Sequence, residues 1–426
     1  MTRSVPSPAD RGPFVVAHVS DLHLSEFGDT FHDRLRVVKR TTNPFPNDPA
    51  KYEVVWEEAG WRVFHMRGKR AAKIALVDPE GYAHPLPSRK EGAGIIDPVE
   101  RAAAKACRLE ARRSVTLASH VPSPGALKHL YEGTPRNSNV RLLRAVQAIE
   151  ERGADAVAIT GDVTDDGSGW ELVESAFKRW KDAGRLFVIP GNHDLYLFPL
   201  RGSGRPKPTY ASKRAAWHAF AERIGLVLDP CGGWVKAVPE ADAYFVGVDS
   251  CARPQRRFFR HNGGIGPAQL EWLRTLGKDP AFRAAKHRLV MLHHHVVPLP
   301  HGVGRKAPSE IGMRLDDAKS AAEVFDEIGA TAILHGHRHV SEQRQPAGSN
   351  FTILASPSLT LGCRSGDDPS FWRIELGEHM RAERVRVPVE GMQQDEDPPE
   401  SVTGAIVESV TNLMEGDDEG FDEDDG

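Results

Sequence analysis

The sequence has few cysteines and no long apolar runs. Its four cysteines form no C-x-x-C pair, which excludes a zinc ribbon and a thioredoxin-type motif and favours reduced thiols. No apolar run reaches the roughly 18 residues that a membrane-spanning helix needs. The polar, proline-rich start also lacks the apolar stretch of a signal peptide. We therefore expect a soluble, cytoplasmic protein without a membrane span.

Three catalytic signatures are also missing. The sequence contains no G-x-x-x-x-G-K phosphate loop and no G-x-S-x-G nucleophile elbow. Gly202 and Gly204 lack the spacing of a dinucleotide-binding fingerprint. These absences argue against a kinase, a serine hydrolase and a dehydrogenase.

Basic residues are absent after Arg386, whereas the segment from Glu390 to the end holds fourteen acidic residues. The formal net charge of −4 therefore conceals a body with a charge near +10. Such a body could attract anionic substrates, but the excess is small and dispersed, so nucleic acid is not indicated. The composition of residues 390–426 predicts an acidic disordered tail, which leaves open a contact with a protein partner.

Five short apolar runs stop abruptly at polar residues, as buried strands that end in loops do. They are residues 14–20, 154–160, 185–190, 288–292 and 331–334. Helical patterns alternate with them at 139–152, 170–183, 211–224 and 319–328, and two late strands are expected at 351–356 and 370–376. This alternation predicts a layered α/β fold, in which ligands lie just beyond the strand ends.

The segment 41–135 breaks this alternation. Residues 52–67 and 73–86 have the pattern of antiparallel strands, and a helical pattern follows at 98–113. We therefore expect an inserted α+β segment at 41–135 within a catalytic domain of residues 14–389. The insertion would either cover the site and select the substrate or mediate self-association into a homo-oligomer.

All five predicted strand ends carry residue types that bind metals. Asp21 and His23 flank one residue, so their side chains point to the same side of an extended strand end. Gly161 permits a tight turn that could aim Asp162 inward. Asn192, His193 and Asp194 follow the third run, and six histidines lie within 293–295 and 335–339 after the last two. Each residue alone is most often a solvated or capping residue, but their joint occurrence predicts a metal site.

In this order the boxes resemble those of the calcineurin-like metallophosphoesterases: D-x-H, G-D-x-x-D, G-N-H-D/E, a lone histidine box and G-H-x-H. Here they are Asp21–His23, Gly161–Asp165, Gly191–Asp194, His293–His295 and Gly336–His339. Residues 246–250 and 263–273 also resemble the branch that contains bacterial cyclic-nucleotide and glycerophosphodiester phosphodiesterases. The resemblance covers residues 14–35 and 139–376.

The resemblance implies a four-layer α/β/β/α sandwich that holds two divalent or transition metal ions. One ion would be bound by Asp21, His23, Asp162 and His339, and the other by Asp162, Asn192, His293 and His337. A mixed carboxylate, amide and imidazole shell suits Mn, Fe or Zn better than calcium or magnesium. His193 would not bind metal; its implied role is to stabilise the transition state or to protonate the leaving alkoxide.

Two departures from the family pattern leave questions open. The lone histidine box continues through Val296 and Val297 before Pro298, so either His293 or His294 could be the ligand, and we prefer His293 because it is nearest the strand end. The connection from the first box to the second is far longer than the usual single helix. In addition, Lys207, Lys213 and Arg214 fit either a substrate rim or a solvated surface.

Together these patterns predict an enzyme that hydrolyses a small phosphodiester, such as a cyclic nucleotide or a glycerophosphodiester, through a metal-bound hydroxide. A nuclease or a phosphomonoesterase is the alternative within the same superfamily. A non-catalytic interaction scaffold is the alternative from another class, and degenerate ligand boxes would have favoured it. The boxes are intact, which favours the enzyme.

Overall fold

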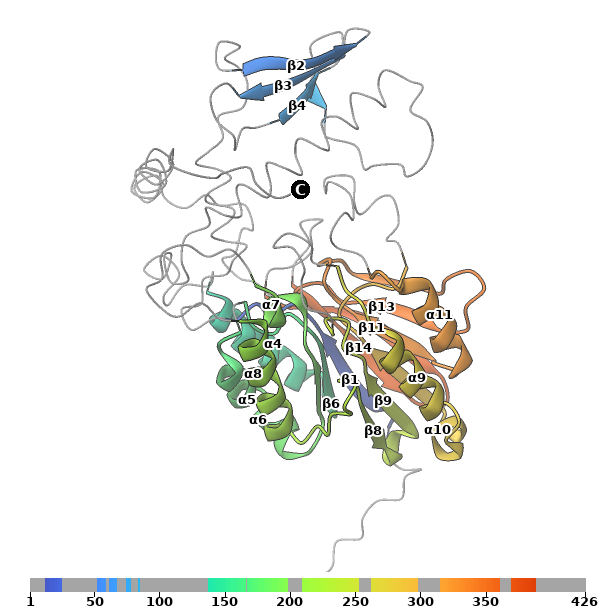
Figure 1. Ribbon diagram of the computed structural model, residues 1–426. Helices are drawn as coiled ribbons and strands as arrows, with labels where there is room; N and C mark the ends of the chain where they lie inside the picture. Colours follow the sequence, from blue (N-terminus) through green and yellow to red (C-terminus); the bar gives the residue numbers. More distant parts are fainter. Residues whose placement is uncertain are drawn as a thin grey trace, which may run out of the picture.

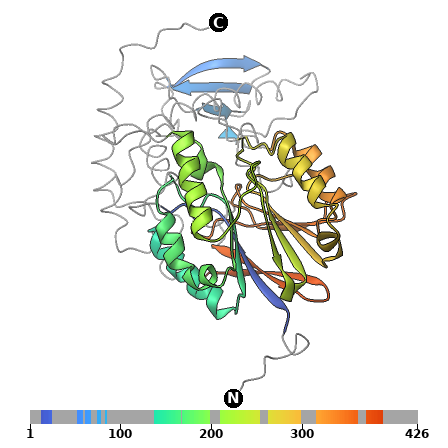
Figure 2. The same cartoon turned by 60° about the horizontal axis from the view of Figure 1, so that its bottom comes forward.

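The computed structural model describes residues 12–24, 137–165, 167–197, 209–252, 262–297, 315–360 and 369–387, and the backbone of four strands between 52 and 84. Within these ranges two β-sheets face each other, and helices lie on their outer sides (Figure 1, Figure 2). The mixed α/β class expected from the sequence is confirmed.

The first sheet has five strands in the order β15-β14-β1-β6-β7. Its members are β1 (Phe14–Val19), β6 (Ala156–Thr160), β7 (Leu186–Ile189), β14 (Ser370–Leu376) and β15 (Met380–Arg386). Strands β1, β6 and β7 are parallel, whereas β14 is antiparallel to β1 and to β15. The three parallel strands are buried along nearly their whole length, as expected for strands covered on both faces.

The second sheet has six strands in the order β12-β13-β11-β10-β9-β8. Its members are β8 (Trp234–Val238), β9 (Ala243–Gly247), β10 (His287–Met291), β11 (Ala332–His335), β12 (Glu342–Arg344) and β13 (Thr352–Ala355). The four central strands β9, β10, β11 and β13 are parallel, and the two edge strands are antiparallel to their neighbours. The parallel strands of both sheets therefore present their C-terminal ends to loops that can converge.

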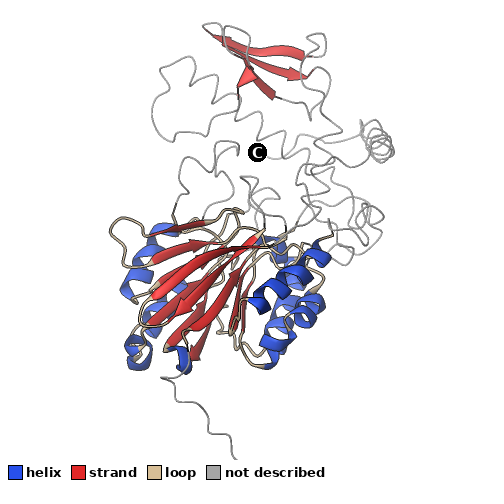
Figure 3. Ribbon diagram, turned by 180° about the vertical axis from the view of Figure 1, so that it is seen from behind, coloured by secondary structure: helices blue, strands red, loops and turns tan. Residues whose placement is uncertain are grey.

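Helices cover the outer faces of both sheets (Figure 1, Figure 3). Beside the first sheet lie α4 (Ser138–Glu151), α5 (Trp170–Ala176), α6 (Lys178–Asp182) and α8 (Tyr210–Arg223), and beside the second lie α9 (Pro267–Leu276), α10 (Pro280–Ala284) and α11 (Ala318–Glu327). The short helix α7 (Asn192–Leu195) and the 3-10 turn η3 (Pro239–Ala241) follow β7 and β8. The helix predicted at 170–183 is divided at Phe177, whose φ of −102° and ψ of 22° leave the helical region.

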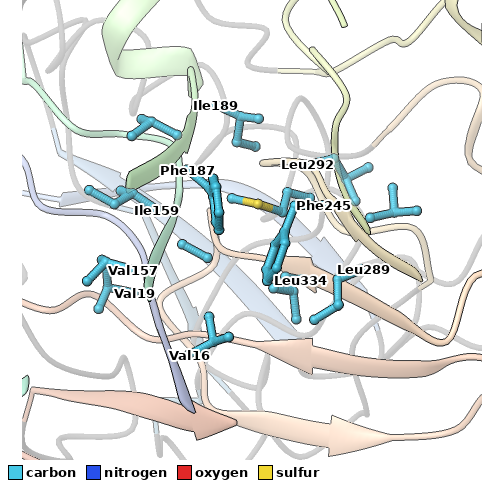
Figure 4. Close-up of a cluster of buried hydrophobic side chains, with 14 of the residues drawn as sticks. Val16, Val19, Val157, Ile159, Phe187, Ile189, Phe245, Leu289, Leu292 and Leu334 are labelled. Carbon is cyan, nitrogen blue, oxygen red and sulfur yellow. The ribbon is translucent and has the colours of Figure 1, made fainter. Parts of the chain in front are cut away.

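The core lies between the two sheets (Figure 4). Phe187 of β7 stacks on Phe245 of β9 with ring centroids 4.4 Å apart. The indole of Trp234 donates to Val188 O across the sheets at 2.9 Å, and Trp372 donates to Ala355 O at 2.8 Å. Each large apolar side chain buried here contributes about 1.5–3 kcal/mol, so the interface between the sheets is rigid enough to fix the loops at its edge.

A third, antiparallel sheet is formed by β2 (Tyr52–Glu58), β3 (Trp61–Met66), β4 (Ile74–Val77) and β5 (Ala83–His84). The antiparallel strands predicted in the insertion are thereby confirmed. The helical pattern predicted at 98–113 and the acidic segment 390–426 lie outside the described residues. Among the helices that the structure describes, none is long and apolar enough to span a membrane.

Candidate metal centre

The predicted site residues, seven proposed metal ligands and His193, follow the C-terminal ends of parallel strands from both sheets. Asp21 and His23 follow β1, Asp162 follows β6, Asn192 and His193 begin α7 after β7, His293 follows β10, and His337 and His339 follow β11. All eight side chains are buried or nearly so. The strand ends of the two sheets thus bring together residues that are more than 300 positions apart in the sequence.

The backbone at these loops is strained. Six non-glycine residues in the described part of the chain have positive φ, and five of them are predicted ligands: Asp21, His23, Asp162, His337 and His339, with φ between 47° and 72°. Side chains with a Cβ rarely adopt this region, and such outliers concentrate at functional sites. Two hydrogen bonds between the loops hold the conformation, from Asp21 N to Gly161 O at 3.0 Å and from His23 N to Asp162 O at 2.9 Å.

Asp21, His23 and His339 form the first group of donors. His23 Nε2 lies 3.1 Å from His339 Nε2, and His339 Nε2 lies 3.4 Å from Asp21 Oδ1. Two imidazole nitrogens that point at each other beside a carboxylate can both be satisfied by one cation between them. The group therefore has the composition and convergence of a metal site.

Asp162, His293 and His337 form the second group. His293 Nε2 lies 3.2 Å from Asp162 Oδ2, 3.2 Å from His337 Nδ1 and 2.9 Å from Asn192 Oδ1. His294 has a different environment, with its Nδ1 2.8 Å from Ser250 Oγ. Of the two candidate ligands in this box, His293 lies in this group of donors that could hold a metal ion.

A third group, His23, Asp162 and His193, connects the other two. Asp162 belongs to two groups and stands between the donors from the two sheets. The carboxylate, amide and imidazole donors fit two ions such as manganese, iron or zinc, which accept nitrogen as readily as oxygen. The geometry therefore agrees with a binuclear centre in which Asp162 is shared.

The electrostatic environment favours the ligand form of Asp162 and His337, whereas burial would lower the pKa of His293 but the neighbouring Asp162 raises it to about 9. Burial by itself would raise the pKa of Asp162, but the neighbouring His293 and His193 lower it well below its ordinary value. Burial lowers the pKa of His337 well below its ordinary value. An ionised carboxylate and a neutral imidazole are the forms that bind metal, so the shifts of Asp162 and His337 favour cation binding by these two residues.

His193 lies beside both groups and is held by a residue that sequence reasoning did not assign. Its Nδ1 lies 3.2 Å from Asp165 Oδ1, and its Nε2 lies 4.0 Å from Asp162 Oδ2. The same Asp165 oxygen lies 3.4 Å from His23 Nδ1. Asp165 is the last residue of the G-D-x-x-D box, and that position was the signal that could have identified it.

Asp194 joins two of the ligand-bearing loops. Its carboxylate accepts hydrogen bonds from Val163 N at 3.1 Å, Thr164 N at 2.7 Å, Thr164 Oγ1 at 2.8 Å and Gly191 N at 2.8 Å. It therefore fixes the loop after β6 to the start of α7. The fourth residue of the G-N-H-D box has a structural function that its position in the box alone did not reveal.

Lys207, Lys213 and Arg214 were expected to lie at a substrate rim or on a solvated surface. This expectation is wrong for Lys213 and Arg214. Lys213 is buried, with only 4% of its surface exposed, and Arg214 pairs with the buried Asp249 at 2.5 Å. Lys207 lies outside the described residues. Lys213 shares one face of α8 with Trp217 and Phe220, and this spacing was the available signal that it is buried.

Comparison with known proteins agrees with the motifs. The family model for calcineurin-like phosphoesterases matches residues 134–341. A manganese-dependent ADP-ribose/CDP-alcohol diphosphatase of Arabidopsis thaliana is 26% identical over 236 residues, which is 48% of this chain and 71% of the relative. The first box, with Asp21 and His23, precedes the residues matched by the family model.

Two solved structures resemble the fold at low sequence identity. A dimetal phosphatase from Danio rerio has a TM-score of 0.44 and 12% identity, over 89% of this chain and all of the other. A purple acid phosphatase from yellow lupin has a TM-score of 0.40 and 12% identity, over 60% of this chain and 48% of the other.

Proposed function

Since the chain is a metallophosphoesterase of the calcineurin-like kind and therefore a metal-dependent hydrolase of phosphoric esters, we propose that it cleaves small anionic substrates at a phosphorus with two bridging oxygens. The cyclic nucleotide and glycerophosphodiester expected from the sequence have such a phosphorus. ADP-ribose, which the name of the Arabidopsis relative gives as its substrate, also has such a phosphorus in its diphosphate. The observation that carries the proposal is the pair of donor groups from two sheets, with His193 beside the shared Asp162.

Each ion has four proposed ligands. Asp21, His23, Asp162 and His339 would hold one ion, and Asp162, Asn192, His293 and His337 would hold the other. Two such ions would supply the activation of a water for in-line attack and the positive charge that balances the charge developing on the phosphoryl group. The burial of the donors keeps competing water away from the centre and strengthens these electrostatic effects.

His193 is the residue proposed to act on the leaving group. It is 6% exposed, and Asp165 faces its Nδ1, which leaves Nε2 on the side of Asp162. A carboxylate at one ring nitrogen fixes the orientation and the tautomer of an imidazole. His193 can therefore present a proton to the departing oxygen, or donate a hydrogen bond to the phosphoryl group, from a fixed position.

A substrate panel tests the proposal. Wild type and Asp162→Ala are loaded with Mn²⁺ and assayed on bis(p-nitrophenyl) phosphate, a cyclic nucleotide, glycerophosphocholine, ADP-ribose and p-nitrophenyl phosphate. We expect kcat/KM for one of the diesters or the diphosphate to exceed that for the monoester by at least about tenfold, because the site is selective for the transition state it stabilises. A preference for the monoester would replace the proposal with a phosphomonoesterase.

The same preparations distinguish the proposed enzyme from a nuclease and from an interaction scaffold. Nicking of supercoiled plasmid at a rate above turnover of every small diester would indicate a nuclease. Two bound ions without turnover of any substrate would favour a scaffold. We further propose that residues 390–426 serve a protein contact rather than the chemistry, so a variant that ends at Val389 should keep wild-type turnover.

A further inference from the structure

Lys213 of α8 reaches the backbone of the proposed catalytic histidine. Its Nζ donates to His193 O at 2.7 Å and to Tyr196 O at 2.8 Å. His193 is the second residue of α7, a helix of only four residues, and Tyr196 is the residue that follows the helix. A lysine ammonium has three donors, so it can hold two carbonyls at the C-terminus of a helix and complement the partial negative charge there.

The lysine is fixed in this position by its surroundings. The side chain is almost completely buried, and α8 is anchored in the core through Trp217 and Phe220. The backbone of Gly167 also approaches so closely that a Cβ there would lie 3.1 Å from Lys213 Cγ and Cε. The ammonium therefore has little freedom to leave the two carbonyls.

The next residue of α8 is also largely buried and has a different target. Arg214 pairs with Asp249, and Asp249 also accepts a hydrogen bond from Cys251 N at 2.8 Å. Asp249 follows β9 in the second sheet, whereas His193 follows β7 in the first. Two consecutive basic residues thus reach loops of different sheets, and of these two only Lys213 is bonded to His193.

We propose that Lys213 is a positioning residue for His193, an inference that rests on the proposed function. Lys213 fixes the main chain of His193 through its carbonyl, and Asp165 fixes the ring through Nδ1. Together with the bond from His193 N to Asp162 Oδ1, these two attachments determine where Nε2 points. Asp162 and Asp194 hold the start of α7, so without Lys213 its later residues can shift, and a displacement of about 1 Å can lower the rate of an oriented reaction about 10²-fold.

A double-mutant cycle of Lys213→Met with His193→Ala tests this role. The rate is measured on a diester with an alkoxide leaving group, for which proton donation matters most, and metal content is measured in the same preparations. We expect Lys213→Met to keep two ions and to lower kcat about 10²-fold with little change in KM. In the His193→Ala background, Lys213→Met should lower kcat by less than about threefold, since the side chain that Lys213 positions is gone.

Arg214→Met is the matched control, because it removes a buried cation from the same helix. We expect its effect on kcat to be equal in the presence and absence of His193. An equal effect of Lys213→Met in both backgrounds, or loss of the metals from this variant, would overturn the proposal. If Lys213→Met does not fold, Lys213→Gln, which keeps shorter N–H donors, takes its place in the cycle; failure of both to fold also rejects a positioning role.

The cycle separates this inference from the proposed function. If His193→Ala with two bound ions turns over as fast as wild type, the role of His193 itself is wrong and the role of Lys213 falls with it. If His193→Ala is slow and the fold-reductions in kcat from the two substitutions multiply in the double variant, only the role of Lys213 is wrong.

Discussion

Asp162 Oδ2 lies 3.2 Å from His293 Nε2, across the space between the ends of β6 and β10. The other oxygen of the same carboxylate accepts a hydrogen bond from His193 N at 2.8 Å. Asp162 is thus in contact with the second sheet and with the loop that carries the proposed acid. Like His23, Asp162 also belongs to two of the donor groups.

Asp162→Ala is therefore expected to empty both metal positions, whereas Asp21→Ala leaves the group around His293 intact. Plasma mass spectrometry should find two ions per wild-type chain and fewer than one in Asp162→Ala. Turnover of bis(p-nitrophenyl) phosphate should fall by more than about 10²-fold, since mutation of a residue that only supports a metal ligand already lowers activity by up to that factor.

Asp242→Asn provides the control for this experiment. Asp242 is the one described non-glycine residue with positive φ that is not a predicted ligand, and it follows η3. Asparagine tolerates this conformation, so the variant should keep both ions and full turnover. Retention of two ions by Asp162→Ala would contradict the shared position.

Asp165→Asn should slow turnover without removing metal. Asp165 Oδ1 lies 3.2 Å from His193 Nδ1 and 3.4 Å from His23 Nδ1, and an amide cannot accept from both in the same way. We expect kcat to fall by about 10-fold to 10²-fold, less than the 10²-fold to 10⁴-fold range for loss of a general acid in His193→Ala. A loss in Asp165→Asn larger than that in His193→Ala would indicate that Asp165 acts mainly through His23.

The strands and the convergence of the proposed ligands could be predicted because each buried apolar run ends where a residue of a metal-binding type begins. The parallel arrangement of β1, β6 and β7 then places Asp21, Asp162 and Asn192 at one edge. This inference needs only local patterns and the rule that ligands lie beyond the strand ends.

The residues that were missed act through contacts that no local pattern specifies. Asp165 contacts His193, which is 28 positions away, and Lys213 contacts a carbonyl 20 positions away. Whether His293 or His294 faces Asp162 depends on how the loop turns after β10, which spacing along the chain does not determine. Lysine side chains are ordinarily solvated. The four-residue spacing between Lys213 and Trp217, which places both on the buried face of α8, was therefore not taken as a sign that Lys213 is buried.

Glu174 predicts a pH dependence of stability at a site distant from the metal. Its carboxylate binds Lys181 Nζ and Arg223 Nε, each at 2.6 Å, and so joins α5, α6 and α8. Burial would raise the pKa of Glu174, but the two cations lower it below the ordinary value of 4.5. The carboxylate is therefore ionised in the folded state at a pH where it is protonated in the unfolded chain.

A lowered pKa of an acid stabilises the fold above its unfolded value, and this contribution is lost as pH falls through the folded value. Glu174→Gln should lower the free energy of unfolding by less than about 1 kcal/mol at neutral pH, since Arg223 remains partly exposed. The difference between the variant and wild type should shrink below a pH of about 4.5, measured by urea denaturation. A difference that is constant with pH would show that lost packing, rather than charge, is responsible.

Gly191 offers a test of how tightly the centre is packed. Its φ of −110° and ψ of −175° are accessible to any residue, so the backbone conformation does not require glycine. A Cβ at this position would, however, overlap Asp162 N and Oδ1 and lie 2.9 Å from Asp162 Cγ. Gly191→Ala must displace the proposed bridging carboxylate, and overpacking of this kind costs about 1–3 kcal/mol.

We expect Gly191→Ala to lose metal and turnover together while keeping the fold, with a lower Tm. Gly184→Asn is the control, because a Cβ at Gly184 meets nothing within 4 Å and asparagine tolerates its φ of 64°. That variant should keep two ions and a wild-type rate. If Gly191→Ala instead bound two ions and kept wild-type turnover, the loops after β6 and β7 would have moved apart to accommodate the added methyl group. The shared carboxylate would then not be held by the packing of glycine against Asp162.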